Sequence, residues 1–227
     1  MQSIRGWTNL EQCTISQDFP FPENGPFESY HTRLTSLSLT VPGVTDKWFE
    51  NLGGLKFVEY YAKDKLSDSN LSLKHLTALD SLVLFGSQIH ELTSTNLTQL
   101  ELFAVEEKFL EREGDKLGNV KELILDLHDL PKDLTVENFH SYEWLTTMTT
   151  LEYLQIVPIQ HKGLSFVSTT LKSLDITINN NVPADLAHVS RFASLKQLYV
   201  ACYNQKDQGD CRCITHINAN TIGELKH

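Results

Sequence analysis

One six-residue phrase recurs along the chain and constrains its fold more than any other feature. The phrase is Leu-x-x-Leu-x-Leu with conservative variation, and it occurs nine times. Self-similarity at a period of about 20 to 30 residues is typical of a solenoid, in which each repeat forms one coil. The nine phrases begin at positions 10, 34, 55, 79, 97, 120, 151, 171 and 195, so their spacing runs from 18 residues (79 to 97) to 31 residues (120 to 151).

Within each phrase, the alternation of apolar residues predicts one short parallel strand. The fourth and sixth residues alternate with more polar ones at the period of a strand, and the first residue turns the chain into it. A single coil cannot bury its own apolar edge, so neighbouring coils must stack to form a core. We therefore expect one α/β domain over residues 1–227, with a parallel, concave sheet of about nine strands.

The segments that return the chain between phrases differ in length and predict a mixed outer side. Asp46–Leu52, Val136–Met148 and Pro183–Phe192 space their apolar residues as helices do, and we expect an outer helix at each. The returns before Leu97 and Leu171 are too short for a full helix and two turns. We expect extended or 3₁₀ connections there.

The phrases resemble those of leucine-rich-repeat proteins, and the resemblance covers about residues 7–203. Residues 204–227 are then expected to form a C-terminal cap or tail. Standard repeats carry Asn or Cys three residues beyond the sixth position, and here only Asn179 matches. Such irregular repeats are similar to those of F-box and other adaptor-type leucine-rich-repeat proteins. That resemblance implies a horseshoe fold and the substrate-recognition part of a ubiquitin ligase, although no F-box module is found in this sequence.

The charge balance limits the classes of partner. Lys and Arg total 19 against 29 Asp and Glu, so the net charge at pH 7 is -10. This charge repels nucleic acid and anionic membranes at long range, and we expect neither as a partner. Residues 1–10 lack the pattern of a signal peptide, which favours a cytoplasmic or nuclear location. The triplets that begin at Asn70 and Asn96 match the acceptor pattern for N-glycosylation, Asn-x-Ser/Thr. They keep open an alternative, an extracellular or pathogen-delivered ligand binder.

The side chains that should point out of the concave sheet are biased towards aromatic and acidic types. They are the third and fifth residues of each phrase and the residue after it, 27 positions of which six are aromatic, five acidic and none basic. Such a surface is typical of a scaffold that binds a basic polypeptide, although aromatics on a sheet also pack on one another to stabilise it. The candidate binding residues are Phe57, Glu59, Tyr61, Phe85, Glu101, Phe103, Glu122, Asp126, Tyr153 and Asp175.

Two further features bear on chemistry. Cys202, Cys211, Cys213 and His216 are the ligand set of a Cys₃His zinc site, but the Cys-x-Cys spacing is unusual, and free thiols or a disulfide are favoured. The sequence holds no nucleophile elbow and no phosphate-binding glycine loop, so we expect no enzyme, no cofactor and no metal. Cys13 stands at an inward position of the first phrase and is expected to be a small buried apolar residue.

Overall fold

The chain consists of two compact units, Met1–Leu117 and Gly118–His227. The structure is a computed structural model, and it describes residues 7–16, 25–29, 31–62, 70–86, 88–103, 114–126, 142–159, 166, 168–179, 189, 191–203 and 215–218. Coils of a solenoid contact mainly their neighbours, so a division into units can fall within an array. The expectation of a single domain over residues 1–227 stays a prediction.

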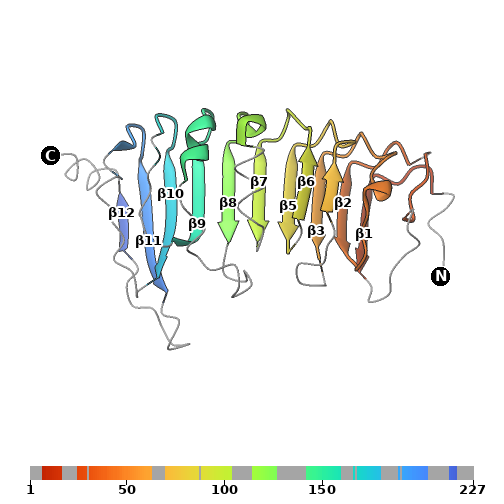
Figure 1. Cartoon of the computed structure of the whole chain (residues 1–227), viewed down its shortest axis with the longest axis horizontal. Helices are drawn as coiled ribbons and strands as arrows, with labels where there is room; N and C mark the ends of the chain where they lie inside the picture. The colour runs from red at the N-terminus through yellow and green to blue at the C-terminus, as the bar shows by residue number, and fades with distance from the viewer. Residues whose placement is uncertain are drawn as a thin grey trace. The chain divides into compact units, whose positions relative to one another are not determined.

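Every phrase forms a strand that starts at the third residue of the phrase, as the alternation predicts (Figure 1). Within each unit the paired phrase strands are parallel, and successive coils stack as in a β-solenoid. In the first unit they are β1 (Gln12–Ser16), β2 (Ser36–Thr40), β3 (Phe57–Tyr61), β5 (Ser81–Phe85) and β7 (Gln99–Phe103). In the second unit they are β8 (Glu122–Asp126), β9 (Tyr153–Ile159), β10 (Ser173–Asn179) and β11 (Gln197–Tyr203).

The strands of the first unit pair in the order β1-β2-β3-β5-β7, with equal phrase positions side by side. The third residues of the phrases thus form one row across the sheet: Gln12, Ser36, Phe57, Ser81 and Gln99. A second, two-stranded parallel sheet forms from the returns that follow β3 and β5, and it was not predicted. Its strands are β4 (Asn70–Leu73) and β6 (Gln88–Leu92).

The second unit repeats this pairing. Strands β8, β9, β10 and β11 are parallel neighbours, and Glu122, Tyr153, Ser173 and Gln197 lie in one row. A strand outside the phrases, β12 (Thr215–Asn218), pairs with β11 in antiparallel orientation. The tail after the last phrase therefore contributes a strand to the sheet of this unit.

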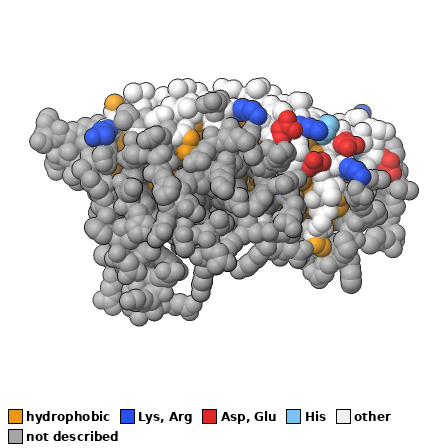
Figure 2. All heavy atoms as spheres, viewed as in Figure 1, with side chains coloured by type: hydrophobic (Ala, Val, Ile, Leu, Met, Phe, Trp, Pro, Cys, Tyr) orange, Lys and Arg blue, Asp and Glu red, His pale blue; other side chains and the backbone are white. Residues whose placement is uncertain are grey.

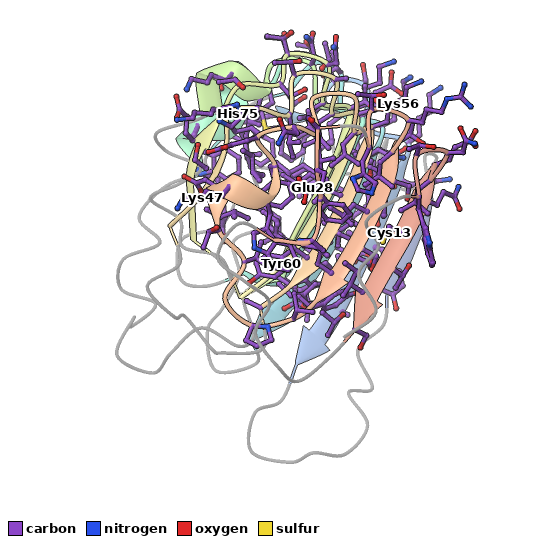
Figure 3. The ribbon with its side chains drawn as sticks, turned by 90° about the vertical axis from the view of Figure 1, so that its right-hand side faces the viewer. Cys13, Glu28, Lys47, Lys56, Tyr60 and His75 are labelled. Atoms are coloured by element: carbon purple, nitrogen blue, oxygen red, sulfur yellow. The ribbon has the colours of Figure 1, made fainter. Side chains whose placement is uncertain are left out.

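The fourth and sixth residues of the phrases form the core, as expected. Leu82 is fully buried and lies between Val58 and Leu100 of the neighbouring strands. Figure 3 views the first unit from the β1 end and shows Tyr60 on the side of the sheet that faces the core. The prediction for Cys13 was wrong in degree, because β1 is the end strand of the pairing order and the thiol is only half-buried. This partial burial still raises the pKa of Cys13.

One backbone contact repeats at the start of the strands and locks successive coils in phase. The carbonyl of the second phrase residue accepts two hydrogen bonds, from the N–H groups of the second and third residues of the next coil. The acceptors are Glu11, Thr35, Lys56 and Asp80 in the first unit and Lys121, Glu152 and Lys172 in the second, with N···O distances of 2.8–3.2 Å.

Hydroxyl groups take part in joining the coils where the asparagine ladder of regular repeats is missing. The Thr35 hydroxyl donates to the Glu11 carbonyl at 3.2 Å, and the Ser94 hydroxyl, which is buried, donates to the Leu79 carbonyl at 2.7 Å. In the second unit the Thr170 hydroxyl donates to the carbonyl of Leu151 at 2.8 Å. Backbone carbonyls of the first and second phrase residues thus accept hydrogen bonds from hydroxyl groups of the following coil.

The predicted outer helices are wrong where the structure describes them. Asp46–Trp48 forms a 3₁₀ turn, η1, instead of a helix over Asp46–Leu52. Another 3₁₀ segment, η4, covers Glu143–Thr147 within the predicted helix Val136–Met148, of which residues 136–141 lie outside the described ranges. The segment predicted at Pro183–Phe192 lies outside them too, except for residues 189, 191 and 192. A further 3₁₀ turn, η2, spans Gly114–Leu117, and no α-helix occurs in the part of the chain that is described.

The first of these errors has a physical cause. The side chain of Asp46 does not cap a helix, because its Oδ1 accepts a hydrogen bond of 2.6 Å from the N–H of Ser72 in β4. Trp48, Phe49 and Leu52 are nevertheless buried, so the apolar spacing was correct and the type of turn was not. A 3₁₀ turn rises about 2.0 Å per residue against about 1.5 Å in an α-helix and crosses a coil in fewer residues.

The extended return before Leu97 is confirmed, since β6 occupies it. Most of the return before Leu171 lies outside the described residues. Among the residues that the structure does describe, none belongs to a helix with the length and hydropathy of a membrane span.

The position of a coil in the stack predicts how much its core residues stabilise the fold. Leu82→Ala removes a fully buried side chain between two coils and should lower the free energy of unfolding by about 2–5 kcal/mol. Ile15→Ala changes a half-buried residue of the end strand β1 and should cost clearly less. Urea denaturation followed by circular dichroism measures both, and equal losses would contradict this account of the core.

Candidate functional site

The outward positions of the strands are the surface that the phrases predict. In β2, β3, β5 and β7 the third, fifth and seventh phrase residues are half-buried or exposed, except Val83, which is buried. Figure 2 shows that Lys, Arg, Asp and Glu side chains are interspersed near the edge of the first unit where its strands begin. The outward positions of the strands differ from that edge, because none of them is Lys or Arg.

Three aromatic rings on neighbouring strands form a stacked row, which we call the aromatic ladder: Tyr61 of β3, Phe85 of β5 and Phe103 of β7. The rings of Tyr61 and Phe85 have centroids 4.1 Å apart and planes inclined by 18°. Those of Phe85 and Phe103 are 3.9 Å apart and inclined by 4°. Because the strands are in phase, equal phrase positions bring the rings within contact distance, close to the strand spacing of about 4.8 Å.

Glu59, on the same face of β3 as Tyr61, has a carboxylate that is fixed in position. Its Oε2 accepts a hydrogen bond of 2.7 Å from the Ser38 hydroxyl of β2, and its Oε1 accepts one of 2.9 Å from the Tyr61 hydroxyl. Each carboxylate oxygen can accept about one more hydrogen bond. Within the described residues, no Lys or Arg side chain is paired with Glu59.

Tyr61 lies in negatively charged surroundings. Burial, the hydrogen bond to Glu59, and the negative charges of Glu59 and Glu101 together raise the pKa of Tyr61 above its ordinary value. Glu101 stands two strands from Glu59 in the same row, with Val83 between them. The phenol therefore stays a hydrogen-bond donor to Glu59 well into the alkaline range.

The structure brings five of the predicted site residues together in the first unit. We call Glu59, Tyr61, Phe85, Glu101 and Phe103 the β3–β7 patch. The sixth candidate in this unit, Phe57, lies at the start of β3 between Ser36 and Ser81 and is not part of the aromatic ladder.

The other four candidates lie on the corresponding face of the second unit. Glu122 and Asp126 of β8 are paired in register with Tyr153 and Val157 of β9. The Tyr153 hydroxyl donates to Oε1 of Gln155 at 3.0 Å, and Gln155 stands beside Asp175 of β10. Burial raises the pKa of Asp175.

One residue of the site was missed from the sequence. The outward residues of β2 are small and polar, and the candidate binding residues predicted from the sequence begin with Phe57 in the third phrase. Ser38 nevertheless holds one oxygen of Glu59. The signal was present in the phrases, because aligning them position by position places Ser38 beside Glu59.

The candidate zinc and glycosylation residues fall mostly outside the side chains that the structure describes. Side chains of the cysteine cluster at 202–213 and of His216 lie outside the described residues, as does the side chain of Asn70. Asn96 is exposed and donates to the carbonyl of Thr77 at 3.3 Å. Over the part of the chain that is described, no group of three or more His, Cys, Asp and Glu side chains could hold a metal ion.

Comparison with known proteins finds similar solved structures but no match in sequence. No protein-family model matches the chain, and no curated protein matches its sequence. Among solved structures, an internalin from Listeria monocytogenes is similar with a TM-score of 0.45 and 19% sequence identity. The match covers 78% of this chain and 57% of the internalin, so it spans little more than half the length of that protein.

The raised pKa of Tyr61 predicts a specific alkaline titration. The tyrosine that disappears from the titration in Tyr61→Phe should ionise above the ordinary value of 10.0, and Glu59→Gln should move it down because one negative charge is lost. NMR of ¹³C-labelled tyrosine rings measures this directly, with circular dichroism to confirm folding. A Tyr61 pKa at the ordinary value would contradict the described hydrogen bond.

The same shift has a consequence for stability with a defined sign. The folded state holds the Tyr61 proton more tightly than the unfolded chain does. The resulting contribution to the free energy of unfolding is complete below pH 10 and is lost as the pH rises through the raised pKa of Tyr61. Tyr61→Phe should remove this part of the loss of stability at alkaline pH.

Stacking in the aromatic ladder predicts an energetic coupling between adjacent rings. A double-mutant cycle with Phe85→Ala and Phe103→Ala should give a coupling of about 0.5–1.5 kcal/mol in the free energy of unfolding. Tyr61 and Phe103 lie on opposite sides of Phe85 and do not stack on each other, so their coupling, which runs only through Phe85, should be smaller than that of the adjacent pair. No coupling between Phe85 and Phe103 would mean that the stack does not stabilise the sheet.

Proposed function

We propose that this chain is a protein-interaction scaffold that binds a basic polypeptide on the solvent-facing side of its sheet, with the β3–β7 patch as the main contact in the first unit. The observation that carries the proposal is the aromatic ladder beside two carboxylates, on strands whose outward positions hold no Lys or Arg. Aromatic residues and one-signed charge are features of surfaces that dock proteins.

A purely structural role for the ladder leaves part of this arrangement without a reason. Stacking explains why the rings stand in phase on neighbouring strands. It does not explain why the rings stay half-exposed, or why carboxylates rather than neutral side chains flank them. Two like charges in one row raise the electrostatic energy of the free sheet, and a bound cation would lower it.

The corresponding face of the second unit supports the same role by itself. Its outward positions include Glu122, Asp126 and Asp175, and again no Lys or Arg. A basic partner is therefore favoured on this unit also.

The more specific parts of this function stay proposals. The substrate-recognition role in a ubiquitin ligase is supported only by the resemblance of the repeats to those of F-box and adaptor proteins. A non-catalytic role and a cytoplasmic or nuclear location are supported only by the sequence.

Charge reversal at Glu101 tests the proposed surface. Selection of a displayed library of random polypeptides on the wild-type chain should yield binders enriched in Lys and Arg, and Glu101→Lys should weaken those binders at least about fivefold because attraction becomes repulsion. The matched control is Glu50→Lys, which makes the same charge change in the exposed turn after η1.

Folding of both variants is checked by urea denaturation. Binding that depends on Glu101 but not on Glu50 supports the proposal. Equal effects of the two substitutions, or selected binders without basic residues, would place the binding surface elsewhere.

A further inference from the structure

The aromatic ladder ends at β3, although the sheet continues. Tyr61 stacks on Phe85 with one face of its ring, and the other face is directed along the sheet towards β2. Leu39 and Tyr60 are the last paired residues of β2 and β3, and Thr40 and Tyr61 follow them directly on the two neighbouring strands. Thr40 has no ring. The stack of flat groups that begins at Phe103 is therefore one layer short of β2.

The missing layer would lie beside polar groups that prefer a cation. The Glu59 carboxylate is held next to Tyr61 by the hydroxyls of Ser38 and Tyr61 and retains capacity for further hydrogen bonds. Ser38 also keeps the lone pairs of its hydroxyl as acceptors. A π face, a fixed carboxylate and two small hydroxyl side chains, Ser38 and Thr40, thus come together at the open end of the ladder.

We propose that this end of the ladder binds the side chain of an arginine of the partner protein. The guanidinium plane lies on the outer face of Tyr61 above Thr40, as the fourth layer of the stack, and donates hydrogen bonds to Glu59. The proposal rests on the proposed function, because it names the chemistry of one contact in that surface.

Arginine fits this position better than the alternatives. A guanidinium is planar, stacks on aromatic faces and donates several N–H groups in its plane, whereas the ammonium of lysine is a compact, strongly hydrated charge. An apolar side chain could cover Tyr61 but would bury the Glu59 carboxylate without a counter-charge. The strand spacing of about 4.8 Å leaves room for one flat layer at van der Waals distance.

A short peptide can test this contact without knowledge of the partner. The probe is the capped pentapeptide Gly-Gly-Arg-Gly-Gly, titrated into the full ¹⁵N-labelled chain while the amide resonances of β2 and β3 are followed by NMR. We expect saturable shifts at Ser38, Thr40 and Tyr61. The same peptide with citrulline, which keeps the shape but not the charge, should bind at least about fivefold more weakly, and the lysine peptide should fall between them.

Two substitutions in the chain locate the contact. Thr40→Phe supplies the missing layer from the chain itself and should abolish binding of the arginine peptide. Glu59→Gln keeps the shape of the side chain but removes its charge and should weaken binding at least about threefold. The matched controls are Thr40→Val, which adds no ring, and Thr177→Phe, which places a ring at the same phrase position of β10 in the second unit. Both controls should bind as the wild type does.

The possible results separate this inference from the proposed function. Equal binding of the arginine and citrulline peptides, or binding that Thr40→Phe and Glu59→Gln leave unchanged, would overturn the arginine site. Polypeptides selected through Glu101 would in that case still support the scaffold function. Arginine binding that Thr40→Phe abolishes would support the site even if library selection found no basic partner.

Discussion

The fold depends on the phase in which one coil is placed against the next. At the start of the strands, the carbonyl of the second phrase residue receives two N–H groups of the following coil, as Thr35 does from Lys56 and Phe57. A shift by one residue would break both hydrogen bonds and turn every apolar side chain to the opposite face of the sheet. This double penalty explains why returns of very different length still deliver each phrase to the same position. Variation is confined to the returns, which are free to be 3₁₀, extended or paired as β4 and β6 are.

The same phase creates the candidate site. Residues at equal phrase positions become neighbours across the sheet even when some twenty residues of sequence separate them. Tyr61, Phe85 and Phe103 are all seventh-position residues, and this alone brings their rings to 3.9–4.1 Å. Glu59 and Glu101 share the fifth position, so their charges act together on Tyr61. In a fold of this kind, a function can therefore be encoded as a column of an aligned repeat rather than as a local motif.

The strands could be predicted from the sequence because burial repeats along the chain with a fixed period. All nine strands were predicted because burial alternates with strand period in each phrase, and the sheet enforces that alternation. The outer helices were not predictable in the same way, since Trp48, Phe49 and Leu52 are buried equally well by a 3₁₀ turn, and the choice was made by the bond from Ser72 to Asp46. Strand β4 carries no phrase and gave no signal, whereas the segment of β6 was predicted only as a short extended or 3₁₀ return and not as a paired strand. Ser38 was overlooked because its importance lies in its neighbour Glu59 across the strand boundary and not in its own side chain.

Whether the ladder serves the fold or a partner is not a choice between exclusive roles. Each stacked ring covers one face of its neighbour, so Phe85, in the middle, has both faces covered and can offer only its edge to a ligand. Tyr61 differs, since one of its faces is turned towards the small residue Thr40 and its hydroxyl holds Glu59. Stacking makes this end rigid before any partner arrives, which reduces the entropy that binding must overcome. Phe85 thus stabilises the sheet, and Tyr61, which Phe85 holds in place, offers a ring face for recognition at the β3 end of the ladder.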